Sequence, residues 1–320
     1  MTEDARQSAT LSSRWRVAEV RGQSRSLIQA SCQGCHACDR YNLPMSRPAN
    51  LVAFETSSET ISVAVARGEK VVSREIAEAG QQSGELALPT MHDLLAEIGL
   101  AVGDIDVVVF GQGPGSFTGV RVACGIAQGL AYGLGKPVIA LPTPLALAEA
   151  AKRGGAEHIL VATDARMGEI YLAAYVQDAS VPTGFSEVVP PSLLKPEEFD
   201  AIVVPQLPAQ FLASRWTGIG SAFAVPVLGG ALTASKLVSI GVPRSLVFPS
   251  AADLIRVAQR MLARAGEAAT IRPHDAAPLY VRNKVALTIE ERRLNAAAKA
   301  ESAAEAKAHL IDKPLVGVAS

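Results

Sequence analysis

Short apolar runs separated by polar turns open the patterned part of the chain, which begins near Asn50. Between residues 51 and 76, three such runs are joined by a Thr/Ser turn and by the turn at Arg67-Gly68. Runs joined by such short turns predict antiparallel strands. Apolar residues then recur at about every 3.6 positions from Gly84 to Ile98, which predicts a helix.

A buried strand, a glycine-rich loop and a second helix follow. The run Asp106–Phe110 is apolar after its first residue, as in a strand that is buried on both faces. After the loop, the pattern predicts a helix from about Phe117 to Gly135, a strand at Pro137–Ala140 and a helix near Pro144–Ala151. This alternation of strands and helices predicts an α/β protein.

The strand pattern then starts again. From His158 to Val176 the chain repeats the order strand, polar turn, strand. An acidic residue stands at the same point of both turns. At an offset of 109 residues, the matched pairs are Ala53 with Ala162, Glu55 with Asp164, and Ile61 with Ile170. This register predicts two duplicated lobes.

The C-terminal part of the chain is less regular. The Pro- and Val-rich stretch 181–250 has no clear period, and within it we interpret Thr217–Gly220 as a loop that follows a strand. Residues Ala251–Ala265 are predicted to form a helix, and 273–286 a compact segment with a cluster of Tyr280, Arg282 and Asn283. From Thr288 onward Ala, Lys and Glu dominate, as in a solvated helix or a loose tail.

The composition excludes several classes of protein. With 30 basic and 31 acidic residues, the formal charge of the 320-residue chain is −1, so no global electrostatic attraction draws it to nucleic acid. Any RNA contact then goes through a local patch or a partner. Hydrophobic residues make up 49% and charged residues 19%, which excludes wholesale disorder. Four cysteines do not form a disulfide scaffold.

Neither a membrane span nor a signal peptide is predicted. The most apolar long stretch, Gly119–Ala148, is interrupted by Arg121, Gln128, Lys136 and three prolines. The first 22 residues lack the apolar segment of a signal peptide. We therefore expect a cytoplasmic protein without membrane contact.

The densest motif is GQGPGSFTGVR, which runs from Gly111 to Arg121 between a predicted strand and a predicted helix. Glycines permit unusual backbone angles and close approach, and Ser116 or Thr118 can cap the helix. The motif fits either an anion site at the helix N-terminus or a tight turn without a ligand. It matches neither the dinucleotide fingerprint nor the Walker loop. The candidate residues of this loop are Gly111, Gly113, Gly115, Ser116, Thr118, Gly119 and Arg121.

Four segments together resemble the TsaB (YeaZ) family, in order and at about its spacing. They are FETSSETISVAVA, the stretch VVVFGQGPGSFTGVRVACGIAQGLAYGLGKPVIALPT, DARMGEIYLA and PLYVRNKVA, and they cover roughly residues 50–290. The resemblance implies two ribonuclease-H-like lobes of the actin, sugar-kinase and heat-shock-ATPase type. It divides the chain into an extension at 1–48, lobes at 49–145 and 146–287, and an Ala/Lys/Glu-rich tail at 288–320.

By this resemblance, the chain is a non-catalytic partner of TsaD in tRNA threonylcarbamoyladenosine synthesis. TsaD transfers threonylcarbamoyl to an adenosine beside the anticodon, the ATPase TsaE completes the system, and tRNA is met only through the complex. A homodimer is the other assembly in the family. No cofactor is implied, and we expect weak or no binding of ATP and zinc. The alternative is an ATP-dependent small-molecule kinase of the same fold, or a metallopeptidase-like enzyme.

The titratable residues agree with a non-catalytic subunit. TsaD-like relatives carry two metal-binding histidines four positions apart, but here His92 has Leu88 and Ala96 at that spacing. No metal site is therefore expected. Glu55 and Asp164 stand where this fold holds phosphate or metal, yet TSSET lacks the glycine that a phosphate turn needs. We interpret both acids as degenerate phosphate-site residues that stabilise their turns.

The first two helices are the candidate partner surface, because the family pairs them with the same helices of TsaD or of a second TsaB. The second helix has two rows of small residues. One comprises Gly119, Ala123, Ala127 and Ala131, and the other Gly125, Gly129 and Gly133. At least one row must pack on the sheet of its own lobe. The residues predicted at the interface are Leu88, Met91, Leu95, Val120, Ala123, Ala127 and Leu130.

A cysteine cluster lies in the N-terminal extension. Cys32, Cys35 and His36 match a c-type haem attachment pattern, and the three thiols of Cys32, Cys35 and Cys38 with His36 are alternative ligands for zinc or an iron–sulfur cluster. The extension has few periodic apolar positions, so we favour a disordered segment, or a translated leader upstream of a start at Met45.

Overall fold

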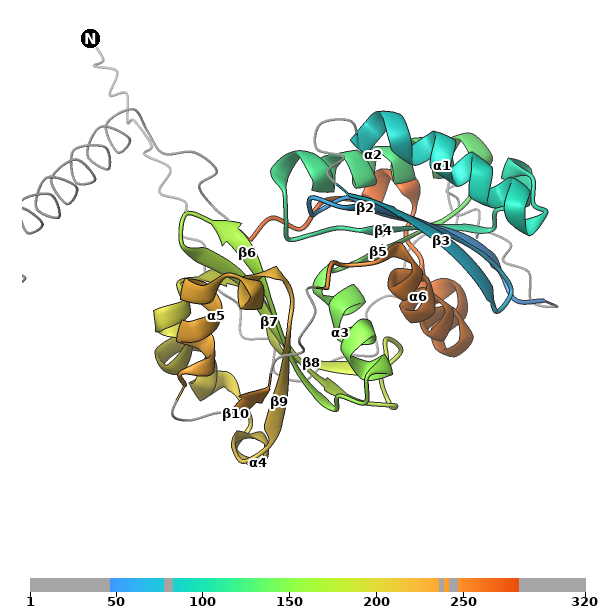
Figure 1. Cartoon of the computed structure of the whole chain (residues 1–320). Coiled ribbons are helices and arrows are strands. Elements are labelled where there is room, and N and C mark those ends of the chain that lie inside the picture. The colour runs from blue at the N-terminus through green and yellow to red at the C-terminus, as the bar shows by residue number, and fades with distance from the viewer. Residues whose placement is uncertain (1–46, 78–82, 236–238, 242–246, 282–320) are drawn as a thin grey trace, which may run out of the picture. The chain divides into compact units, whose positions relative to one another are not determined.

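The computed structural model describes residues 47–77, 83–235, 239–241 and 247–281 (Figure 1). These residues form two five-stranded sheets. The cysteine cluster at 32–38, the start at Met45, the Arg282 and Asn283 pair and the tail at 288–320 lie outside the described residues. Among the described helices, none is long and apolar enough to cross a membrane.

The first sheet mixes a hairpin pair with parallel strands, in the order β3-β2-β1-β4-β5. Its strands are β1 (Asn50–Glu55), β2 (Ile61–Arg67), β3 (Lys70–Ile76), β4 (Val107–Gly111) and β5 (Val138–Leu141). The three strands β1, β2 and β3 pair antiparallel, as their short turns predict, while β4 runs parallel to β1 and β5.

The second sheet repeats this topology, in the order β10-β9-β6-β7-β8. It comprises β6 (His158–Arg166), β7 (Glu169–Gln177), β8 (Phe185–Leu194), β9 (Arg215–Ile219) and β10 (Ser239–Gly241). As in the first sheet, three consecutive strands pair antiparallel, and the fourth runs parallel to the first of them. The duplication predicted from the 109-residue offset is confirmed.

One element of the second sheet corrects the sequence prediction. Thr217–Ile219 lie inside β9, paired with Ile159–Val161 of β6, and do not form a loop. The glycine at 218 led to the loop prediction, because glycine is uncommon in strands. Here the Phe223 ring lies 2.6 Å from where a Cβ would stand, so the strand needs a residue without a side chain. The turn comes at Gly220, whose φ of 119° suits glycine.

Six α-helices are described. They are α1 (Ser83–Ile98), α2 (Phe117–Leu134), α3 (Pro144–Arg153), α4 (Ala209–Leu212), α5 (Pro226–Thr233) and α6 (Ala251–Ala265). Short 3-10 or π turns occur at Val102–Asp104, Pro196–Glu198, Phe199–Val203, Val204–Gln206, Ser221–Ala224, Gly266–Ala269 and Pro273–Asp275. The helices predicted near 84–98, 117–135, 144–151 and 251–265 are therefore confirmed.

The first sheet is covered on both faces because its strands alternate their buried side chains. Val52 and Phe54 of β1 pack with α1 and α2, while Leu51 and Ala53 pack with α3 and α6 on the other face (Figure 1). Helix α6 follows the second sheet in sequence but packs on β1, β2 and α3 of the first half. The lobe boundaries at 49–145 and 146–287 stay a prediction.

Two buried acidic side chains join α3 to α6. The Glu149 carboxylate accepts two hydrogen bonds from the Arg260 guanidinium, at 2.9 and 2.5 Å. Asp253 lies between Arg153, at 3.0 Å, and Arg256, at 2.9 Å. Burial raises the pKa of Asp253, and the arginines act in the opposite direction. These pairs fix the helix layer on which both sheets pack.

Candidate functional site

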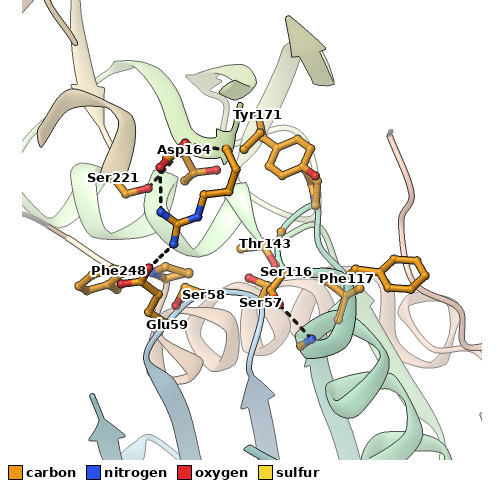
Figure 2. Close-up of a pocket in the computed structure, with 18 of the residues that line it drawn as sticks. Ser57, Ser58, Glu59, Ser116, Phe117, Thr143, Asp164, Tyr171, Ser221 and Phe248 are labelled. Carbon is orange, nitrogen blue, oxygen red and sulfur yellow. Dashed lines mark hydrogen bonds and ion pairs between the residues drawn. The ribbon is translucent and has the colours of Figure 1, made fainter. Parts of the chain in front are cut away.

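A pocket of about 660 Å³ lies between the turns of the two duplicated hairpins. Figure 2 shows Asp164, Tyr171 and Ser221 on one side, and Ser57, Ser116 and Thr143 on the other. Hydroxyl groups are frequent in its wall. They belong to Thr56, Ser57, Ser58, Ser116, Thr118 and Thr143 of the first half, to Thr163, Tyr171 and Ser221 of the second half, and to Tyr280 near the end of the described chain.

The glycine-rich loop packs directly on the turn between β1 and β2. A Cβ at Gly119 would overlap the Thr56 carbonyl oxygen, and one at Gly115 would lie 2.5 Å from the Ser57 carbonyl oxygen. The Thr56 hydroxyl also donates to the Gly119 carbonyl, at 2.7 Å. The capping residue of α2 is Ser116, whose hydroxyl accepts from the Gly119 N–H at 3.3 Å, and not Thr118. The glycines therefore serve close packing.

Glu55 forms hydrogen bonds with residues that contact the glycine-rich loop. Its Oε1 accepts from the Ser57 N–H at 2.7 Å, and its Oε2 accepts from the Thr143 hydroxyl at 2.8 Å. A Cβ at Gly111 would overlap the carboxylate, so the glycine leaves room for Glu55, which is fully buried and does not line the pocket. Burial raises the pKa of Glu55, while the hydrogen bonds from Ser57 and Thr143 act in the opposite direction. This environment fits a turn-stabilising acid, as we interpreted it from the sequence.

Thr143 was not found from the sequence. Its hydroxyl also accepts from the Gly113 N–H at 3.2 Å, so one side chain links Glu55 to the glycine-rich loop. A threonine just before a helix, in the segment LPTPLA, signals a cap and nothing more. In the structure it is the N-terminal neighbour of α3 and makes no side-chain cap.

Asp164 occupies the place in the second lobe that matches Glu55 in the first, but it is only partly buried. Its Oδ1 accepts from the Arg166 N–H at 2.7 Å, and its Oδ2 accepts from the Arg166 guanidinium at 3.3 Å. The same guanidinium also pairs with Glu59 of the first hairpin, as the dashed lines in Figure 2 show. The ion pair between Arg166 and Glu59 therefore joins the two hairpin turns, and neither residue was predicted.

The predicted partner interface needs correction. Five of its seven residues are buried within their own lobe: Met91, Leu95, Val120, Ala123 and Ala127. The row that contains Ala123 and Ala127 faces the sheet, where small side chains let α2 approach the strands closely. Leu130 is half-buried, and Leu88 alone of the seven is well exposed, at 43%.

The second row of small residues is the exposed one. A Cβ built on Gly125, Gly129 or Gly133 would meet nothing within 4 Å. Tyr132 beside them is 81% exposed. We call the surface formed by Leu88, Gly125, Gly129, Tyr132 and Gly133 the outer face of α1–α2.

Arg121 is not part of the loop but lies on α2. Its guanidinium is stacked on the Phe117 ring at 3.7 Å, and its Nε donates to the Tyr280 hydroxyl at 2.8 Å. The segment that carries Tyr280 is held along α2, because Gln128 donates to the Ala276 carbonyl at 2.9 Å. In the same segment, the Leu279 N–H donates to the Gln112 carbonyl at 2.7 Å. Part of the compact segment predicted at 273–286 thus lies beside the glycine-rich loop.

Metal-binding chemistry is not assembled in the described part of the chain. No group of three or more His, Cys, Asp and Glu side chains is close enough there to hold a metal ion. His92 is exposed on α1. Glu55 is fully buried and hydrogen-bonded to Ser57 and Thr143, and Asp164 is paired with Arg166, so neither carboxylate is free to bind a cation in this arrangement.

Comparison with known proteins identifies the family. A family model described as "TsaD: tRNA N6-adenosine threonylcarbamoyltransferase" matches residues 75–286. The tRNA threonylcarbamoyladenosine biosynthesis protein TsaB of Escherichia coli (strain K12) is 33% identical over 241 residues, which cover 74% of this chain and 96% of that protein. TsaB of Haemophilus influenzae is 45% identical over 130 residues, 40% of this chain and 54% of that protein.

Solved structures agree with the sequence relatives. YeaZ from Pseudomonas aeruginosa matches with a TM-score of 0.61 and 30% identity, over 72% of this chain and 99% of that one. A second structure, titled as an uncharacterized protein with similarity to peptidase YEAZ from the same organism, matches with a TM-score of 0.62 and 31% identity, over 73% of this chain and 100% of that one. The chain belongs to the TsaB (YeaZ) family.

Proposed function

We propose that the chain acts in tRNA threonylcarbamoyladenosine biosynthesis as a non-catalytic subunit that binds a TsaD-type transferase through the outer face of α1–α2. The names of its relatives support the pathway. The observation that carries the subunit role is the exposed glycine row of α2, together with the exposed apolar side chains of Tyr132 on α2 and Leu88 on α1.

No packing contact with the described part of the chain requires the glycine row. Glycine inside an exposed helix is less favourable than alanine by about 1 kcal/mol, yet nothing in the structure would obstruct a Cβ at Gly125 or Gly129. A helix without Cβ atoms on one face lets another helix axis approach closely. The exposed Tyr132 and Leu88 supply apolar area on either side, and aromatic residues are enriched at interfaces. A specific contact of this kind buries about 800 Å² on each partner.

The rest of the assembly follows from this contact. TsaE joins the pair to complete the bacterial system, and tRNA binds to the complex and not to this chain alone. The neutral charge of the chain supports this, because a net charge of −1 gives no general attraction for RNA. Without the transferase, the same face supports a homodimer.

A second candidate is an enzyme of the same fold, a kinase or a peptidase-like hydrolase. The pocket between the hairpins and the transferase family model favour it. Two observations oppose it. The Glu55 carboxylate is fully buried and does not line the pocket, and Asp164 is bound by Arg166. A catalytic carboxylate must reach the reacting group, and Glu55 does not.

Binding to the TsaD-type transferase of the same organism tests the proposal. Gly129→Arg places a long cation on the outer face, where an unpaired charge cannot be desolvated. We expect binding to weaken by about a hundredfold or more, with loss of tRNA modification in the reconstituted system. Gly230→Arg is the matched control, because Gly230 is also an exposed helical glycine with open space but lies on α5. Equal binding by wild type and Gly129→Arg would overturn the proposed interface.

A further inference from the structure

Arg121 is the one charged residue in the sequence of α2, and it lies in the second turn from the N-terminus. The helix dipole does not stabilise a cation there, because its partial negative charge lies at the other end of the helix. Arg121 nevertheless forms no ion pair with any residue that the structure describes. Its position raises the local positive potential and is not explained by a contact with an acid in the described chain.

The guanidinium is instead held by two aromatic side chains. Its Cζ lies 3.7 Å from the centre of the Phe117 ring and 5.7 Å from that of Tyr280, and the two rings are 5.8 Å apart. The Nε donates to the Tyr280 hydroxyl, which leaves the two terminal nitrogens of the fork without a protein partner among the described residues. Both rings also line the pocket between the hairpins, and Figure 2 shows Phe117 at the side of it away from Asp164 and Glu59. The fork is therefore ordered before any ligand arrives, which reduces the entropy lost on binding.

The segment of chain that follows α6 brings Tyr280 to Arg121. After α6 the chain bridges to β5, where Ile271 and Val138 exchange backbone hydrogen bonds of 2.8 and 2.9 Å. It then runs along α2 through the Ala276 carbonyl and reaches the glycine-rich loop at Leu279. Tyr280 is about half exposed, as is Phe117, so covering apolar surface does not account for their positions. Both rings remain available for contact with another molecule.

We propose that Arg121, held between Phe117 and Tyr280, binds a carboxylate of the partner protein that covers the outer face of α1–α2. This inference rests on the proposed function. Charge complementarity selects the partner group, since the remainder of the α2 sequence from Val122 to Leu134 carries no charge and Arg121 is the single cation of the helix. A planar fork binds a carboxylate through two parallel hydrogen bonds, which fixes the orientation of the partner as well as adding affinity. The apolar outer face then provides the buried contact area, and the pairing of Arg121 with the carboxylate fixes how the partner is aligned on that face.

The test measures the affinity of the full chain for the TsaD-type transferase at low and high salt. Arg121→Gln is expected to weaken binding by about tenfold or more at low salt and to remove most of its salt dependence. Arg121→Lys keeps the charge but not the fork, so we expect partial rescue. Tyr280→Phe removes the hydroxyl that holds Nε and is expected to weaken binding by a few-fold. Circular dichroism and thermal unfolding show that each variant is folded.

The outcomes separate this inference from the proposed function. Binding that Gly129→Arg abolishes but Arg121→Gln leaves unchanged, in strength and salt dependence, overturns the Arg121 site alone. Absence of wild-type binding overturns both. A variant Arg121→Gln that binds the transferase normally while the assembled complex loses affinity for tRNA assigns Arg121 to an RNA phosphate, and this also overturns the carboxylate assignment.

Discussion

Replacing Gly129 by alanine is expected to stabilise the free protein and weaken its complex. In the free chain the new methyl group meets nothing within 4 Å, so the change acts on helix propensity alone. Glycine to alanine in an exposed helix gains about 0.5–1 kcal/mol. The midpoint of thermal unfolding should then rise by about 2–4 °C for each kcal/mol in a domain of this size class. Adding Gly125→Ala should roughly double the gain, because the two positions lie one turn apart and both are open.

In the complex the same methyl group has the opposite effect. A close helix contact has no room for it, and an extra methylene in a packed contact costs about 1–3 kcal/mol. This predicts a loss of affinity between about fivefold and a hundredfold. Calorimetric titration with the TsaD-type transferase measures the affinity, and chemical denaturation of the free chain measures the stability. The control is Gly230→Ala on α5, which should stabilise the protein similarly and leave binding unchanged.

Two results would refute this reasoning. A destabilised Gly129→Ala protein would show that the space beside α2 is not open. An alanine variant that is more stable and binds as tightly as the wild type would show that the glycine row is not at the contact.

Three further predictions concern the acids and the extension. Glu55→Gln should leave the reconstituted pathway within a few-fold of normal, and a loss of about a hundredfold would revive a catalytic role. Burial raises the native pKa of Glu55, so ionisation of this group lowers the free energy of unfolding as the pH rises above 4.5 toward the raised value. Chemical denaturation at several pH values should show a smaller decline of this free energy in the glutamine variant. Glu149→Ala should destabilise the fold by about 3–5 kcal/mol, since it leaves Arg260 partly buried and unpaired, whereas Asp93→Ala, at an exposed pair with Arg74, should cost less than about 1 kcal/mol. A chain that starts at Met45 should fold, bind and support modification as the full chain does; loss of activity together with loss of stoichiometric zinc or iron in a Cys32, Cys35 and Cys38 triple-serine variant would contradict this.

Most of the fold followed from periodicity, because strands and helices impose different spacings on buried residues. The helix 251–265 was predicted to the residue, since its apolar stripe is regular and Gly266 follows it. The second lobe between 181 and 250 was not resolved. There a 10-residue edge strand contains Pro190 and Pro191, short helical turns follow one another, and Gly218 lies within a strand. Each of these features needs tertiary contacts, such as that of Phe223 with Gly218, which sequence spacing does not contain.

The residues of the candidate site were also predicted only in part. The sequence pointed to the glycine-rich loop, to Glu55 and to Asp164, but not to the residues that bind them. Thr143 lies 88 positions from Glu55, and Glu59 lies 107 positions from Arg166. The sheet order β1-β4-β5 brings Thr143 near Glu55, and the packing of the two hairpins brings Glu59 to Arg166.

The helical periodicity of α2 could find its small residues but could not decide which row faces the sheet. Both rows contain residues four positions apart, and a helix surface presents both equally. Burial decides between them: Ala127 is fully buried, whereas Gly129 is exposed and open. Beyond Gly119, which packs on the Thr56 carbonyl, the row that packs on the strands needs small size but tolerates a methyl group, so alanine suffices there. A row of glycines that faces outward weakens the free helix without aiding its packing, and this cost is recovered only when another surface approaches. The chemical difference between alanine and glycine in the two rows therefore supports the proposed partner on the outer face, while the buried row packs on the sheet.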